Sequence, residues 1–151
     1  MEKIHLSKDF KEFIELLNKN NVRYIVVGAY AVGLHGYVRF TGDLDIWVEP
    51  TPENAINLMS CIAEFGFGPF KDLSVEDFTK ENTVVQFGYP PLRIDVMTSV
   101  SGIHFSECYE KRQLTVVDGT ILPYLDLESL KKNKAATNRK KDLDDLENLP
   151  Q

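Results

Sequence analysis

The chain has 151 residues, of which 43% are hydrophobic and 26% are charged, and its formal net charge is −6. This length and composition suit a globular domain with a buried core and exclude a disordered chain. The acidic balance argues against a protein that coats nucleic acid through bulk electrostatics. A local basic patch can still hold a single acceptor strand.

The sequence predicts neither secretion nor membrane insertion. Residues 1–5 lack the apolar core of a signal peptide, and the longest apolar stretch, 24–34, is too short and too rich in glycine to span a bilayer. Cys61 and Cys108 lack the spacing of metal ligands, so a pair of reduced thiols is the simpler interpretation. We therefore expect a cytoplasmic protein without membrane contacts.

Helices and strands are predicted in mixed order from the start of the chain. Ser7 is suited to cap a first helix that ends at 18–21. Apolar residues recur at helical spacing within it, namely Phe10, Phe13, Ile14 and Leu17. The continuous apolar run at 24–27 predicts a fully buried strand, and Gly28 separates it from a short helix over 29–35.

The middle of the chain predicts a strand over 43–48, followed by a helix that begins near Pro52 and ends at Gly66. The apolar residues expected on the inner face of this helix are Ala55, Ile56, Met59, Ile62 and Ala63. Two further strands are predicted over 84–87 and 93–97. This part of the chain therefore supplies three strands and one helix.

The last third predicts strands over 113–117 and 121–124, a helix capped by Asp126, and a final helix over 140–149. The segment 71–82 shows no clear pattern. Because no repeat or linker divides the chain, we expect one α+β domain built around a mixed β-sheet.

The most informative motif is the pair of aspartates at the start of the predicted strand 43–48. Alternate side chains of a strand share a face, so Leu44 and Ile46 point to the core while Asp43 and Asp45 project together on the other side. Two neighbouring carboxylates repel each other unless a cation lies between them. Hard divalent ions such as Mg²⁺ prefer these oxygen ligands.

Asp95, on the predicted strand 93–97, offers a third carboxylate. If this strand lies beside the first one, the three carboxylates converge and can hold two metal ions. The alternative is that Asp95 forms a salt bridge with Arg93 or with another surface base. By contrast, Asp142 and Asp144 fall on a predicted helix, where residues two apart do not face each other.

Two further features suggest phosphate contacts. Gly28 stands where a strand enters a helix, and the N–H groups at a helix start bind phosphate, although this junction is also a common packing device. The basic run 131–141 places Lys134, Asn138 and Lys141 on one face if the helix is continuous there. One of these cations can neutralise a triphosphate, and a solvated charged face is the simpler alternative.

Taken in order, these motifs resemble the nucleotidyltransferase superfamily of DNA polymerase β-like folds. Within it, the chain is most similar to the single-domain AbiEii-like and minimal nucleotidyltransferases of prokaryotes. The family has a strand, a glycine-led turn, a D-x-D strand and a later strand with one more aspartate, and the matching residues are Gly28, Asp43, Asp45 and Asp95. Further matches are His35-Gly36, Arg39, Thr41, residues 90–95, and an R-x-K-D-x-x-D signature made by Arg139, Lys141, Asp142 and Asp145.

The resemblance implies a single nucleotidyltransferase-like domain over 1–151 that binds Mg²⁺ or Mn²⁺ and uses an NTP as substrate. It implies that Asp43 and Asp45 bind the metal and that Asp95 is a third ligand or a general base. The implied nucleotide-binding residues are Gly28, Ala29, Arg39, Thr41, Lys134, Arg139 and Lys141. The family usually has Gly-Ser or Gly-Gly where this chain has Gly28-Ala29, so one phosphate-binding hydroxyl is absent and weaker triphosphate affinity is expected.

These observations predict an Mg²⁺-dependent transfer of a nucleoside monophosphate to RNA, a protein or a small molecule, with release of diphosphate. The alternative is a toxin–antitoxin or regulatory partner protein that keeps the fold with weak or no catalysis. Ala29 favours this alternative, whereas the complete set Asp43, Asp45 and Asp95 opposes it.

Overall fold

The computed structural model describes residues 4–38, 42–66, 73–89 and 91–151. The strands are β1 (Tyr24–Val27), β2 (Asp43–Val48), β3 (Val84–Tyr89), β4 (Leu92–Met97), β5 (Gln113–Val117) and β6 (Thr120–Tyr124). The helices are α1 (Lys8–Lys19), α2 (Gly28–Leu34), α3 (Pro52–Phe65), α4 (Phe105–Lys111), α5 (Leu127–Thr137) and α6 (Lys140–Asn148), with a 3₁₀ helix, η1 (Val75–Thr79).

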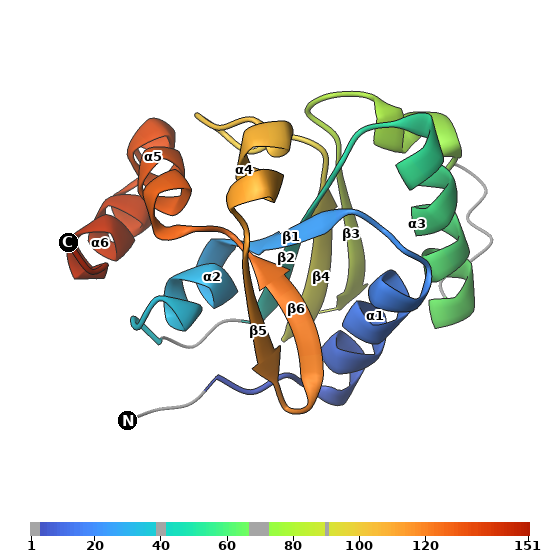
Figure 1. Ribbon diagram of the computed structural model, residues 1–151, viewed down its shortest axis with the longest axis horizontal. Helices are drawn as coiled ribbons and strands as arrows, with labels where there is room; N and C mark the ends of the chain where they lie inside the picture. The colour runs from blue at the N-terminus through green and yellow to red at the C-terminus, as the bar shows by residue number, and fades with distance from the viewer. Residues whose placement is uncertain (1–3, 39–41, 67–72, 90) are drawn as a thin grey trace.

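The strands form one mixed sheet in the order β3-β4-β2-β1-β6-β5. β1 runs antiparallel to β2 and parallel to β6, while β2 and β4 are parallel. Helices cover both faces, with α1 and α3 on one side of the molecule and α2, α5 and α6 on the other (Figure 1). The α+β class with a mixed sheet is confirmed.

Each face of the central strands enters a different hydrophobic cluster. Val26 and Ile46 pack with α1 and α3, whereas Ile25 and Trp47 pack with α2 and α4. The second face is therefore also buried over part of its area. The polar site described below lies on this second face, since Asp45 and Trp47 are two residues apart on β2.

Several element boundaries are local in origin and were predicted correctly. The hydroxyl oxygen of Ser7 accepts a hydrogen bond from the Phe10 N–H at 3.2 Å, which caps α1. The Asp126 carboxylate accepts one from the Ser129 N–H at 3.2 Å, which caps α5. These contacts satisfy N–H groups that have no partner inside the helix.

The predicted inner face of α3 was partly wrong. Ile56 is 55% exposed and Ala63 is also exposed, whereas Asn54 is buried. The Asn54 side chain accepts a hydrogen bond from the Arg23 N–H at 2.7 Å and donates to the carbonyl oxygens of Arg23 and Glu49, both at 3.0 Å. This polar anchor at the ends of β1 and β2 fixes the rotation of the helix, so hydrophobic spacing alone did not identify the buried stripe.

The sequence reading missed two short elements, α4 and η1. α4 has only seven residues and buries only Phe105 and Cys108. Its N-cap residue, His104, makes no capping hydrogen bond with its side chain. η1 lies in the segment that showed no pattern, and its one buried residue is Phe78. Such short elements carry too little periodicity to be recognised.

Cys61 and Cys108 are free thiols, as expected, and they are buried in different hydrophobic clusters. Within the described ranges, every helix falls short of the length and apolar character needed to cross a bilayer.

Candidate active site

Two strands bring acidic side chains together on one face of the sheet. β2 and β4 pair in parallel, with Asp45 opposite Asp95 and Asp43 opposite Arg93. Leu44 and the other alternate residues of β2 point into the core with α1 and α3. The predicted neighbourhood of the two strands is therefore confirmed, and it places the three aspartates on the same face.

The backbone at Gly28 lies against the Asp45 side chain. Val27, the last residue of β1, pairs with Asp45, so the chain turns into α2 directly beside the carboxylate. Gly28 has φ +68°, and a Cβ added there would collide with Asp45 Oδ2. Glycine at this turn is therefore required both by the backbone conformation and by the close approach of Asp45.

Gly28→Ala is expected to lower the free energy of unfolding by about 2–4 kcal/mol, because it adds a steric collision to left-handed strain. Gly119→Ala is the matched control, since Gly119 also has a positive φ (+82°) but nothing lies within 4 Å of an added Cβ. That control is expected to lose only about 1–2 kcal/mol. Urea unfolding of both variants measures the difference, and equal losses would show that Asp45 moves aside without cost.

Arg93 lies between two of the three carboxylates. Its Nη2 is 3.3 Å from Asp43 Oδ2, and its Nε is 3.3 Å from Asp95 Oδ1. The alternative weighed for Asp95, a salt bridge with Arg93, is thus present in the structure. Arg93 Nε and Asp95 Oδ1 are buried atoms that lack a well-aligned hydrogen bond among the described residues, so their contact is an ion pair of poor geometry.

The pKa of Asp45 is set by its burial and by the carboxylates around it. Burial, followed by the negative charges of Asp95 and Asp43, raises the pKa of Asp45 to about 7, although Lys134 and Lys141 act in the opposite direction. Burial also raises the pKa of Asp95, and the neighbouring Arg93 offsets part of that effect. The three carboxylates together therefore carry more negative charge than the nearby cations neutralise.

The metal-free protein is expected to lose stability as the pH rises from about 4 to about 7. The pKa of Asp45 is about 7 in the folded state against 3.8 as the reference, so the folded state holds a proton that the unfolded chain has released in this window. The stabilising contribution is complete below about pH 4 and is lost as the pH passes the folded pKa. Asp45→Asn removes this dependence.

Urea unfolding in EDTA at pH 5 and pH 8 tests this expectation. The stability of Asp45→Asn relative to the wild type should grow by on the order of 2 kcal/mol between these two values, after allowance for solvent screening. Asp144→Asn, at an exposed residue of α6, provides the control. A pH-independent difference for Asp45→Asn would contradict the assigned crowding.

Among the described residues, no group of three or more His, Cys, Asp or Glu side chains has a spacing that could hold a metal ion. Asp43 is held toward Arg93, which separates it from Asp95. The chemistry of the donors still fits a hard divalent cation, because Asp45 and Asp95 are adjacent carboxylates in a buried, under-neutralised position. These two residues would hold the ion first, and Asp43 would join them only after it separates from Arg93.

Lys134 is not the solvent-facing cation that its position in a basic run suggested. It is buried, and its Nζ lies 2.9 Å from Asp142 Oδ1 and 3.2 Å from Asp145 Oδ2. Thr137 and Arg139 also donate hydrogen bonds to Asp142, each at 2.7 Å. The Lys134 ammonium therefore joins α5 to α6, and its contact with a nucleotide stays a prediction.

Lys134, Asn138 and Lys141 were expected to share a face only if the helix is continuous, and this condition is not met. α5 ends at Thr137, and Asn138 adopts a left-handed conformation with φ 53° before α6 begins. The helix is broken, so residues four and seven positions apart no longer align.

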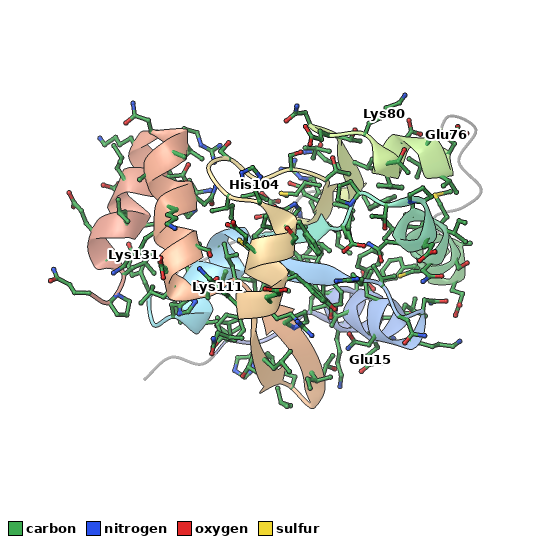
Figure 2. The ribbon with its side chains drawn as sticks, turned by 45° about the horizontal axis from the view of Figure 1, so that its top comes forward. Glu15, Glu76, Lys80, His104, Lys111 and Lys131 are labelled. Atoms are coloured by element: carbon green, nitrogen blue, oxygen red, sulfur yellow. The ribbon has the colours of Figure 1, made fainter. Side chains whose placement is uncertain are left out.

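Figure 2 shows Lys131 on α5 and His104 directly before α4. Neither residue belongs to the acidic group.

A cleft of about 340 Å³ opens beside the carboxylates. Its lining includes Gly28, Asp45 and Asp95 from the sheet side and Lys134, Thr137 and Arg139 from the helical side. This volume falls in the range of small-molecule sites. The helical wall is cationic at its rim, since the Arg139 side chain is 72% exposed.

The other predicted nucleotide-binding residues differ in position. Lys141 is exposed on α6, and its charge lowers the pKa of Asp45. Ala29 is buried at 7% exposure and does not line the cleft. Arg39 and Thr41 lie outside the described residues.

No family model and no curated protein sequence matches the chain. One solved structure that resembles it is that of a "putative nucleotidyltransferase" from Thermotoga maritima, with a TM-score of 0.63 and 15% sequence identity. The match covers 95% of this chain and 94% of the other. The chain has a nucleotidyltransferase-like fold. At this identity the likeness concerns the fold, and the AbiEii-like subtype stays a prediction.

Some residues of the site on this nucleotidyltransferase-like fold were not predicted from the sequence. Arg93 was considered only as a salt-bridge partner, although its position two residues before Asp95 on a strand places both on one face. Thr137 and Asn133 line the cleft without any signal in the sequence, since each depends on packing of α5. Asn133 donates a hydrogen bond to the Ser101 carbonyl oxygen at 3.1 Å, which ties α5 to the segment after β4.

Proposed function

We propose that this protein is a divalent-metal-dependent nucleotidyltransferase of the AbiEii-like type, which transfers a nucleoside monophosphate from an NTP to an acceptor in the cytoplasm. The observation that carries the proposal is the in-register pair Asp45 and Asp95 in the lining of a cleft that also contains the cationic side chains of Lys134 and Arg139. The nucleotidyltransferase-like fold supports the same reaction class.

In this reaction an acceptor oxygen attacks the α-phosphorus of the NTP, the bond to the bridging oxygen breaks, and diphosphate leaves. The divalent ion, when bound, polarises the phosphate oxygens and offsets their charge. Asp45 and Asp95 would hold that ion. Asp95, whose pKa is raised by burial, is also proposed as the acceptor for the proton of the attacking hydroxyl.

The cationic wall of the cleft is suited to the triphosphate. Arg139 exposes most of its side chain there while its Nε stays 2.7 Å from Asp142 Oδ2, so the guanidinium is oriented by a buried carboxylate. Lys141 adds positive charge that reaches Asp45. Catalysis of this kind depends mainly on positioning and on electrostatic stabilisation.

The direct test is incubation with each of the four NTPs labelled at the α-phosphate, with Mg²⁺ or Mn²⁺, in the presence of total RNA or of cell lysate. Metal-dependent transfer of label to a macromolecule or a small molecule would support the proposal and name the acceptor class. Absence of transfer with all four nucleotides and both metals would contradict it.

A second candidate is a regulatory or toxin–antitoxin partner protein that keeps the fold with weak or no catalysis. One observation favours it, because Arg93 already pairs with Asp43 and Asp95 and thereby occupies carboxylates that a metal would need. This candidate forecasts that the wild-type protein binds neither Mn²⁺ nor NTP in solution. Titration calorimetry with MnATP therefore separates the two candidates.

A further inference from the structure

We propose that Arg93 is a built-in counter-ion of the acidic site, and that a divalent cation must displace its guanidinium from Asp95, and then from Asp43, in order to gain its full set of carboxylate ligands. This inference rests on the proposed function, since it concerns how the same site takes up its metal. It assigns a role to a side chain that the reaction as described above does not use.

The backbone positions Arg93 for this role. It lies directly opposite Asp43 in the parallel pairing of β2 and β4, and two residues before Asp95 on the same strand. Side chains two apart on a strand share a face, so Arg93 lies on the same face of the sheet as Asp95. The contacts at 3.3 Å to each carboxylate follow from this placement.

The contacts of Arg93 are of the kind that a stronger cation can replace. The side chains of Arg93 and Asp43 are 31% and 40% exposed, and the Nε contact with Asp95 lacks hydrogen-bond alignment. Half-exposed pairs of this kind contribute little to stability, because water solvates both partners when they separate. A divalent ion carries twice the charge of the guanidinium.

The chain contains a contrasting cluster that shows what a permanent pair looks like. Lys134 lies 2.9 Å from Asp142, and both side chains are buried, at 6% and 1% exposure. The aspartate also accepts hydrogen bonds from Thr137 and Arg139. Arg93 is less buried, its hydrogen bond to Asp43 is longer at 3.3 Å, and its contact with Asp95 lacks hydrogen-bond alignment, which assigns it to a displaceable position rather than to a structural one.

The test measures Mn²⁺ binding by the loss of the free-ion signal in electron paramagnetic resonance, with wild type, Arg93→Met and Arg93→Lys. Arg93→Met, which removes the competing charge, is expected to bind Mn²⁺ about tenfold more tightly. Arg93→Lys keeps the charge and should stay close to the wild type. A second readout is thermal unfolding, in which Mn²⁺ should raise the melting temperature of Arg93→Met more than that of the wild type.

Equal or weaker Mn²⁺ binding by Arg93→Met, with measurable binding by the wild type, would overturn this inference and leave the proposed function standing. Absence of Mn²⁺ binding in all three proteins would overturn both. If Arg93→Met does not fold in EDTA, the comparison is made between Asp43→Asn and the double variant Asp43→Asn/Arg93→Met. Both of these proteins have one carboxylate fewer to neutralise than the wild type. Tighter binding by the double variant would support displacement from Asp95, and equal binding would contradict it.

Discussion

Lys134→Met is expected to lower the free energy of unfolding by about 3–5 kcal/mol, the range measured when one partner of a buried ion pair is removed. Methionine fills most of the lysine volume but leaves Asp142 and Asp145, which are 1% and 2% exposed, without the ammonium that lies between them. Burial by itself would raise the pKa of Asp142, whereas the hydrogen bonds from Lys134, Thr137 and Arg139 lower it to about 2. Urea unfolding at pH 7 measures the loss.

Lys132→Met is the matched control for this substitution. Lys132 is on the same helix, but it is 59% exposed and lies 3.5 Å from an exposed partner, Glu128. Its replacement should change the free energy of unfolding by less than about 0.5 kcal/mol. If Lys134→Met were equally mild and also lost affinity for ATP, the ammonium would be a nucleotide ligand, as the sequence suggested, rather than the link between α5 and α6.

Asp45→Asn is expected to lower the rate of nucleotidyl transfer by at least about a thousandfold, which corresponds to the several kcal/mol that a bound metal contributes to the transition state. The amide keeps the shape of the side chain beside Gly28 but removes the charge that we propose holds the cation. The measurement is label transfer from an α-labelled NTP under single-turnover conditions, with the fold checked by circular dichroism.

Asp144→Asn provides the control for this loss, since Asp144 belongs to the second D-x-D of the chain but is exposed on α6. Its transfer rate should stay within about twofold of the wild type, as expected for a surface substitution away from the site. A transfer rate of Asp45→Asn close to that of the wild type would remove Asp45 from the metal site and with it the proposed mechanism.

Some parts of the site follow from the sequence because they depend on neighbouring residues only. The strand boundaries at 24–27 and 43–48 were predicted correctly, because hydrophobic runs and glycine breaks lie within a few residues of each other. The shared face of Asp43 and Asp45 follows from the two-residue period of a strand. The caps Ser7 and Asp126 likewise require only local hydrogen bonds.

Other parts depended on tertiary structure. The pairing of Asp45 with Asp95 needs β4 to lie beside β2, and the position of Arg93 between Asp43 and Asp95 follows from the register of that pairing. A register shift of one residue would turn Asp95 to the opposite face. No periodicity within either strand specifies this register by itself.

The C-terminal helices show the same division most clearly. By itself the sequence predicted a helix capped by Asp126, a final helix over 140–149 and a basic run over 131–141, since helix caps and spacing are local properties. Only the tertiary structure decided that Asn138 reverses the chain and that Lys134 is buried against Asp142 and Asp145. The physical reason is that an ion pair forms where packing excludes water and brings two helices together, and the choice of partner is made by the whole fold.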